Sequence, residues 1–338
     1  MDINLALTFD DVALVPQFNN VQSRTQPSLE TWLSKSSKIG IPVLCANMDT
    51  TIGDEMADIL IKNGSIPIFH RFTSLEQQKK WVNKYKNNCY ISCGINNFEN
   101  IVELLELGPR GVCIDIAHGH SEVMINLIKR IKSKFPDKEV IAGNVCTSIA
   151  VHDLYNAGAD AIKCGVGPGS CCTTRMVTGF GVPQFTAILN CAKATKKLKI
   201  PLIADGGIRN SRDMVLALAA GASTVMIGGL FSKTFESPSE VIEKNGITYK
   251  KYRGQASKDF QDDYYGQVKT GTVPEGVSFD VECSGSVQDL IDNLCGGLRS
   301  GLTYGGSKSI KELQNKAEFV RVTRNYLTES NPRTQVSK

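Results

Sequence analysis

The chain has 338 residues, 41% of them hydrophobic and 7% aromatic, and its formal net charge is +4. This length fits one large α/β barrel or two ordinary domains. The basic residues are scattered, with modest clusters at Lys196–Lys199 and Lys250–Arg253, which argues against a nucleic-acid-binding face. No stretch approaches about 18 uninterrupted apolar residues, so a membrane-spanning helix is excluded. Eleven cysteines at irregular spacings, with no signal-like segment and no zinc-binding pattern, predict a protein of the reducing cytoplasm.

Eight apolar runs of strand length follow one another along the chain. They are near-continuous rather than alternating, as expected of parallel strands that are buried on both faces. The runs are Pro42–Met48, Ser65–His70, Cys89–Ile95, Gly111–Ala117, Glu139–Val145, Ala161–Gly167, Pro201–Gly207 and Thr224–Gly229.

Helical patterns lie between most of these runs, with apolar residues three and four positions apart. Ser74 and Ser121 are predicted to cap two of the helices. The predicted helices are Asp54–Lys62, Ser74–Lys86, Phe98–Leu107, Ser121–Phe135, Ser148–Asn156, Gln184–Ala194 and Ser211–Ala219, and two more, Val287–Leu298 and Ser309–Ala317, close the chain.

Eight parallel strands with intervening helices predict an α/β fold, the (β/α)8 or TIM barrel, with residues 1–338 as a single domain. A doubly wound sheet is the alternative, but it would need a GxGxxG turn near its first strand, and none is there. The barrel brings the carboxyl ends of all eight strands to one face. The candidate site residues at these ends are Asn47, Met48, His70, Asp115, Asn144, Cys172, Asp205, Gly228 and Gly229.

Two segments fall outside the repeat, the loop Gly165–Pro183 and the polar stretch Ser232–Glu282. A long segment without regular structure on a compact fold is usually a lid or disordered. The aromatic residues Tyr252, Phe260, Tyr264 and Tyr265 favour a segment that docks on the barrel. We therefore predict an active-site flap at about residues 232–282, after the eighth strand.

The stretch Gly165–Arg175, GVGPGSCCTTR, carries the strongest chemical signal. Its glycines let the backbone approach an anion, and Ser170 would donate to a phosphate. Backbone amides around Cys172 would favour a nucleophilic thiolate, with Thr174 as a proton partner. The structural alternative is a tight strand-to-helix connection whose cysteines only pack, and Cys171 is expected to be of that kind.

Glycine pairs follow the last two predicted strands, where barrels often hold phosphate on backbone amides. They are Gly206 and Gly207, and Gly228 and Gly229. Asp205 is predicted to accept two hydroxyls of a ribose. An N-cap or an ion pair with Arg209 is the structural alternative for that aspartate.

These motifs resemble the inosine monophosphate dehydrogenase and guanosine monophosphate reductase family over nearly the whole chain. The matching stretches are LTFDDVALVP (Leu7–Pro16), ANMDT (Ala46–Thr50), IDIAHGHS (Ile114–Ser121), AGNV (Ala142–Val145), GVGPGSCCTTR, ADGGIR (Ala204–Arg209), YRG (Tyr252–Gly254) and VPEG (Val273–Gly276). The resemblance implies a cysteine thiolate that attacks C2 of a purine nucleotide, with hydride exchange with a nicotinamide cofactor.

Within this resemblance, three features favour the reductase branch. The run FHRFTSLEQQKKW leaves no room for the regulatory CBS domain pair that the dehydrogenase usually carries. ANMDT and GGLFS are more similar to the reductase. Asp263 and Tyr264 stand where the dehydrogenase needs an Arg-Tyr pair to activate water, and an aspartate cannot replace a guanidinium. GVPQ and VPEG are more similar to the dehydrogenase.

The predicted activity is therefore that of a GMP reductase, the reductive deamination of GMP to IMP and ammonia with NADPH. The resemblance implies Cys172 as nucleophile and Thr174 and Glu275 as proton donors to the departing amino group. It implies nucleotide binding by Ser170, Asp205, Gly206, Gly207, Gly228, Gly229, Met48, Tyr252, Gly254 and Gln255, cofactor binding by Asp115, Ala117 and Asn144, and a potassium ion on the carbonyls of Gly167, Gly169 and Cys172. It also implies a homotetramer.

Two departures from the family pattern affect the nucleotide site. Gln255 stands where the family commonly has methionine, and Gly229 where the dehydrogenase has a phosphate-binding serine. Three alternatives stay open: an IMP dehydrogenase, a purine-nucleotide sensor without chemistry, and a flavin-dependent barrel.

Overall fold

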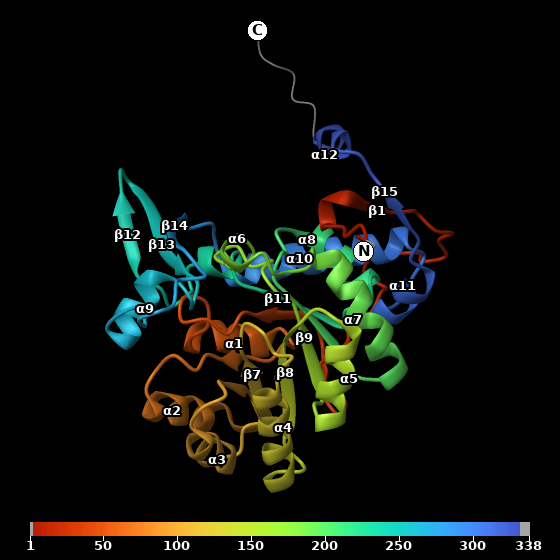
Figure 1. The fold of residues 1–338 in the computed structure, drawn as a ribbon. Helices are drawn as coiled ribbons and strands as arrows, with labels where there is room; N and C mark the ends of the chain where they lie inside the picture. The colour runs from red at the N-terminus through yellow and green to blue at the C-terminus, as the bar shows by residue number, and fades with distance from the viewer. Residues whose placement is uncertain (1–2, 332–338) are drawn as a thin grey trace.

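The computed structural model describes residues 3–331 and shows a parallel eight-stranded barrel (Figure 1). Its strands run in the order β5-β6-β7-β8-β9-β10-β11-β4, with each neighbouring pair parallel. The strands are β4 (Val43–Cys45), β5 (Ile68–Phe69), β6 (Tyr90–Cys93), β7 (Gly111–Asp115), β8 (Glu139–Val145), β9 (Ala161–Cys164), β10 (Leu202–Asp205) and β11 (Thr224–Ile227). Each lies within one of the eight predicted runs, so the predicted (β/α)8 barrel is confirmed.

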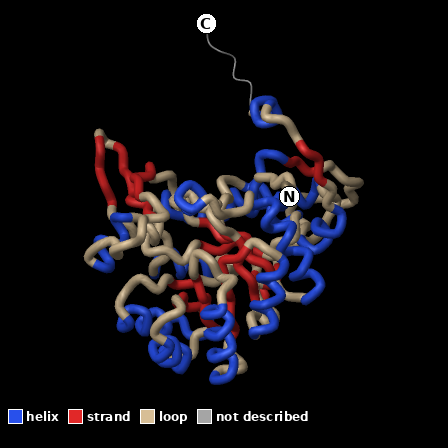
Figure 2. Tube along the Cα trace, viewed as in Figure 1, coloured by secondary structure: helices blue, strands red, loops and turns tan. Residues whose placement is uncertain are grey.

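Helices pack around the barrel strands, and Figure 2 shows several of them in blue below and to the right of the central red strands. They are α1 (Asp54–Lys62), α2 (Leu75–Tyr85), α3 (Phe98–Glu106), α4 (Glu122–Lys134), α5 (Ser148–Ala157), α7 (Gln184–Leu198), α8 (Ser211–Ala219) and α10 (Val287–Tyr304), with the short α6 (Thr174–Thr178) ahead of α7. The side chains of Ser74 and Ser121 accept backbone N–H groups at the starts of α2 and α4, as predicted for caps.

Helix α10 continues to Tyr304, beyond the predicted end at Leu298. The glycines near its end weaken the apolar pattern in the sequence but do not end the helix. Gly297 and Gly301 face α8: a Cβ on Gly297 would meet the Ser211 side chain at 2.3 Å, and one on Gly301 would meet the Val215 side chain at 2.8 Å. The glycines therefore permit close packing of α10 on α8.

The amino-terminal end of the barrel is closed by a hairpin of β2 (Thr31–Trp32) and β3 (Lys38–Ile39). Leu33 and Ile39 pack with the inward-facing residues of the barrel strands, among them Tyr90 and Met226. Since this end is filled by apolar side chains, the open end of the barrel is the one where the strands finish.

The predicted absence of regular structure in Ser232–Glu282 is wrong. After a 3-10 turn, η3 (Phe231–Lys233), the segment forms the antiparallel strands β12 (Val241–Lys244), β13 (Ile247–Arg253) and β14 (Ser278–Glu282), with helix α9 (Lys258–Tyr265). In Figure 1 they project from the barrel mouth. Asn245 and Gly246 join β12 to β13 with positive φ at both residues, and this Asn-Gly pair is the strong hairpin signal that the sequence contained.

Two of the four aromatic residues expected to dock this flap are buried, Tyr252 at 3% and Phe260 at 1% exposure. Tyr264 and Tyr265 are exposed. Tyr252 packs with Cys171 and Val281, and the Phe260 and Phe72 ring centroids lie 4.7 Å apart. The flap is thus a folded element that docks on the barrel.

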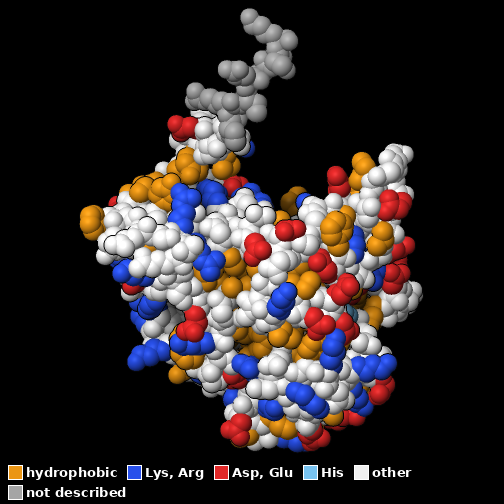
Figure 3. All heavy atoms as spheres, turned by 180° about the vertical axis from the view of Figure 1, so that it is seen from behind, with side chains coloured by type: hydrophobic (Ala, Val, Ile, Leu, Met, Phe, Trp, Pro, Cys, Tyr) orange, Lys and Arg blue, Asp and Glu red, His pale blue; other side chains and the backbone are white. Residues whose placement is uncertain are grey.

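One of the remaining elements, η2 (Lys86–Asn88), directly follows α2, and the others lie near the two ends of the chain. These others are η1 (Phe9–Asp11), α11 (Ile310–Lys316), α12 (Asn325–Ser330), and β1 (Val12–Leu14), which pairs antiparallel with β15 (Phe319–Arg321). Between residues 3 and 331, no helix combines the length and apolar character that a membrane crossing requires. Figure 3 shows lysine and arginine interspersed with acidic residues on the face seen from behind.

Candidate active site

A pocket of about 330 Å³ opens at the carboxyl end of the barrel, between the strand ends and the flap. Most of the predicted site residues line it. These are Met48, Asp115, Ala117, Asn144, Gly167, Gly169, Cys172, Thr174, Asp205, Gly206, Tyr252, Gly254, Gln255 and Glu275. Ser170, Gly207, Gly228 and Gly229 are not among its lining residues. His70 is buried, accepts the amide of Phe72 at 3.2 Å, and also lies outside the lining.

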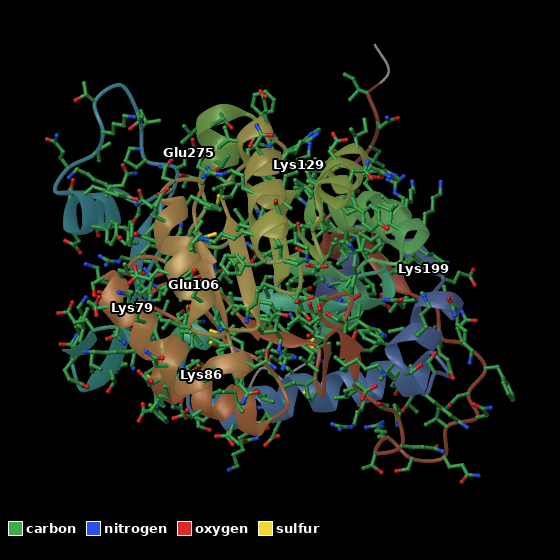
Figure 4. All side chains as sticks on the ribbon, turned by 90° about the horizontal axis from the view of Figure 1, so that it is seen from below. Lys79, Lys86, Glu106, Lys129, Lys199 and Glu275 are labelled. Carbon is green, nitrogen blue, oxygen red and sulfur yellow. The ribbon has the colours of Figure 1, made fainter. Side chains whose placement is uncertain are left out.

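A thiol, a hydroxyl and a carboxylate form a continuous chain in this pocket. The Sγ atom of Cys172 lies 3.2 Å from Oγ1 of Thr174, which in turn donates to Oε2 of Glu275 at 2.8 Å. Cys172 lies on the loop after β9, Thr174 begins α6, and Glu275 comes from the flap. Figure 4 labels Glu275 on the flap side of the barrel mouth.

Backbone contacts fix the flap against this loop. The amide of Thr173 donates to the carbonyl of Glu275, and the amide of Val277 donates to the carbonyl of Cys171, both at 2.9 Å. Gly276 lies between them, where a Cβ would come within 3.0 Å of the Cys171 carbonyl oxygen. The position of the Glu275 side chain is therefore set by main-chain pairing.

The two adjacent cysteines have opposite environments. Cys172 is exposed, whereas the other ten cysteines are buried or half-buried. Burial raises the pKa of the Cys171 thiol to about 12, which keeps it protonated. Only Cys172 of this pair can therefore be reached by a substrate.

A second corner of the mouth is formed by Ser170, Tyr252 and the glycines after β11. The Ser170 hydroxyl lies 3.3 Å from the Tyr252 hydroxyl. A Cβ on Gly228 would come within 2.5 Å of the Tyr252 oxygen, and one on Gly229 within 3.1 Å of Ser170 Oγ. This corner combines hydroxyl donors with side-chain-free backbone, as a phosphate requires.

We expect Gly228→Ala to weaken binding of a nucleotide monophosphate by about tenfold, since a methyl group there displaces the Tyr252 hydroxyl. Gly296→Ala on α10 is the matched control, because a Cβ there would have no neighbour within 4 Å. Titration calorimetry with GMP measures both variants. Equal affinity in the two would contradict the phosphate role of this corner.

The structure pairs Asp205 with Lys163, a residue that sequence analysis missed. Lys163 Nζ donates to Asp205 at 2.5 Å and to Asp115 at 2.8 Å. The alternative ion pair of Asp205 with Arg209 is wrong, because Arg209 binds Asp10 and Asp213 instead. A lysine inside the apolar run Ala161–Gly167 was the available signal, because a buried charge needs partners.

Amide side chains complete this polar cluster. Asn144 donates to Asp205 at 2.9 Å, and Asn47 donates to Asp115 at 2.9 Å. The pKa of Asp115 lies below its usual value, because the pull of Lys163 and Asn47 outweighs the effect of burial, which raises it. Asp115 is thus held ionised at the pocket wall.

Gln255 is oriented by the barrel. Its Nε2 donates to the carbonyl of Asn47 at 2.9 Å, which leaves its amide oxygen as the group for a ligand. The preceding Arg253 donates to Asp49 at 2.7 and 2.9 Å and forms an ion pair with Asp263 of α9. Arg253 therefore ties the flap helix to the loop after β4.

The pocket wall around Asp115 suits a hydroxyl-rich, anionic cofactor. Arg71 lines this wall and supplies a positive charge, and Asn144 Oδ1 is buried with no hydrogen-bond partner among the described residues. Such an orphaned acceptor needs a donor to satisfy it. Asp115, Ala117 and Asn144 therefore fit the predicted nicotinamide cofactor.

The loop predicted to hold potassium offers carbonyl oxygens, the donor type that this ion takes. Some of these oxygens are already engaged. The carbonyl of Gly169 accepts the amide of Cys172 at 3.0 Å, and the Arg175 guanidinium donates to the carbonyls of Val166 and Val182. The potassium ion on Gly167, Gly169 and Cys172 stays a prediction.

Comparisons with known proteins agree on one family. Residues 6–333 match the model of the IMP dehydrogenase / GMP reductase domain. The chain is 38% identical to GMP reductase 1 of Homo sapiens, over 97% of this chain and 98% of the relative. It is also 38% identical to the inosine-5'-monophosphate dehydrogenase of Borreliella burgdorferi, over 97% of this chain and 96% of the relative.

Among solved structures, the chain is similar to a cysteine-to-alanine variant of GMP reductase from Trypanosoma brucei in complex with guanosine 5'-monophosphate. The TM-score is 0.94, with 29% sequence identity and 99% of each chain covered.

Proposed function

Because the chain belongs to the IMP dehydrogenase / GMP reductase family, we propose that it is a GMP reductase that converts GMP to IMP and ammonia with NADPH. The observation that carries this proposal is the contact chain from Cys172 through Thr174 to Glu275. These contacts support a nucleophile beside a proton path in one pocket. The GMP complex of the structural neighbour supports a purine mononucleotide as substrate.

In the proposed reaction the Cys172 thiolate adds to C2 of the purine. Thr174 and Glu275 pass a proton to the exocyclic amino group, because ammonia leaves far more easily than an amide anion. The C–N bond then breaks and the purine stays attached to sulfur through C2. A bound nicotinamide cofactor would supply the hydride that C2 takes up. The carbon–sulfur bond then breaks, which returns the Cys172 thiolate and leaves IMP.

The remaining predicted residues would bind rather than react. Asp205 would accept the ribose hydroxyls, and Ser170, Gly207, Gly228 and Gly229 would surround the phosphate. Met48, Tyr252, Gly254 and Gln255 would border the purine side. Asp115, Ala117 and Asn144 would hold the cofactor.

The flap favours the reductase over the dehydrogenase. A dehydrogenase must activate water to hydrolyse its covalent intermediate, and the resemblance locates the arginine for that step at the position of Asp263. Here Asp263 is bound to Arg253, and the Arg253 guanidinium is also engaged by Asp49. Both groups are committed to holding the flap, which supports a reaction that needs no activated water.

Two parallel assays of nicotinamide absorbance test the proposal, GMP with NADPH and IMP with NAD, both with potassium. We expect loss of NADPH absorbance in the first assay and no change in the second. A rise in the second alone would establish the dehydrogenase. No absorbance change in either assay, with GMP binding still detected by calorimetry, would favour a nucleotide sensor. A yellow purified protein would favour a flavin enzyme.

The same proposal includes five further points: a preference for NADPH over NADH, a bound potassium ion, a homotetramer, a cytoplasmic location, and residues 1–338 as one domain. Each follows from the family resemblance or from composition and is tested separately.

A further inference from the structure

Lys163 lies at the centre of the barrel mouth although no motif points to it. It is in β9, its exposure is 1%, and its ammonium group donates to carboxylates from two other strands. Burial lowers the pKa of a lysine, but Asp115 and Asp205 hold the Lys163 pKa well above its ordinary value. The ammonium is therefore permanently charged and shared.

The two carboxylates face different parts of the pocket. Asp115 ends β7 and lies beside Ile116 and Ala117, on the wall assigned to the cofactor. Asp205 ends β10 and precedes Gly206, on the wall assigned to the nucleotide. Both carboxylates accept hydrogen bonds from the Lys163 ammonium. If one carboxylate moves and pulls the ammonium with it, the hydrogen bond of the ammonium to the other carboxylate changes.

Each carboxylate also has an amide of its own. Asn47 contacts only Asp115 of the pair, and also donates to Ser92 at 2.8 Å. Asn144 contacts only Asp205 of the pair, and also donates to the Gly165 carbonyl at 2.7 Å. Each carboxylate therefore has one asparagine that contacts it alone, and the two carboxylates share the ammonium of Lys163.

We propose that Lys163 is a positioning residue that holds the nucleotide-binding and cofactor-binding carboxylates together and so couples the two binding steps. This inference rests on the proposed function for the identity of the two ligands. The ammonium group of Lys163 donates to Asp115 and Asp205, and it acts through these two carboxylates. Binding of one ligand then changes the affinity for the other, and the coupling free energy depends on the hydrogen bonds of this ammonium.

The test measures equilibrium binding rather than turnover, with GMP followed by calorimetry and NADPH by its fluorescence. Lys163→Met, which preserves shape and removes charge, is expected to weaken both ligands by about tenfold or more. Asn47→Ala, which removes a donor to Asp115 but none to Asp205, is expected to weaken NADPH alone by several-fold. Coupling is measured as the ratio of the GMP affinities with and without NADPH, in the Cys172→Ala background in which no turnover is expected. Lys163→Met should bring this ratio close to one, and Asn47→Ala should leave it unchanged.

Unchanged affinity for either ligand in Lys163→Met would overturn the inference, and so would a ratio of GMP affinities with and without NADPH that Lys163→Met leaves unchanged. Removal of a buried cation can unfold a protein. Lys163→Gln therefore serves as the second variant, since it retains a donor, and it should weaken both ligands to an intermediate degree. Failure of the unaltered protein to bind GMP would refute the proposed function instead.

Discussion

Replacement of Cys172 by alanine is expected to abolish turnover while GMP still binds with an affinity within about threefold of the unaltered protein. The thiolate forms the only covalent bond between protein and substrate in the proposed reaction, and Cys172 is the exposed cysteine of the pocket. Loss of a covalent nucleophile lowers the rate by at least about 10³-fold. The nucleotide contacts lie on other residues, so binding should persist.

The matched control is Cys283→Ala. Cys283 is a half-buried cysteine at the end of the flap that does not line the pocket. Absorbance assays with GMP and NADPH measure turnover, and calorimetry measures GMP affinity. Turnover by Cys172→Ala at more than a trace of the normal rate would refute the covalent scheme, whereas loss of GMP binding would show that the thiol serves the ground state.

The second large effect is expected at the proton path. Thr174→Val and Glu275→Gln should each lower kcat by about 10² to 10³-fold with little change in nucleotide affinity. Each removes one link of the contact chain that we propose carries a proton to the leaving amino group. The double variant should be little worse than either single one. Groups that act as a unit are not additive.

Glu282→Gln is the control for the charge of the flap, since Glu282 is an exposed residue of β14 outside the pocket. Steady-state rates and calorimetry on the same preparations distinguish kcat from binding. Losses that multiply in the Thr174 and Glu275 double variant would mean that the two residues act separately, and losses confined to binding would remove both from the chemistry.

The main error of sequence analysis concerned the flap. Residues 232–282 looked polar and irregular because two of the three strands are mostly exposed, so the apolar alternation of a half-buried sheet is faint. The Asn245-Gly246 pair was the local signal for a hairpin in this segment. Aromatic character predicted the burial of Tyr252 and Phe260, but it did not distinguish them from Tyr264 and Tyr265, which are exposed.

By itself, the sequence determined the eight strands, most helices and the loop that presents Cys172. These features depend on apolar periodicity, helix caps and glycines, and residues close together in the chain are enough to recognise them. Tertiary structure alone decided that Lys163 joins Asp115 to Asp205, that Arg253 is held by Asp49 and Asp263, and that Asp205 does not meet Arg209. Such partners stand 10 to 204 positions apart in the chain, so their meeting depends on strand register, barrel closure and flap docking rather than on any local pattern.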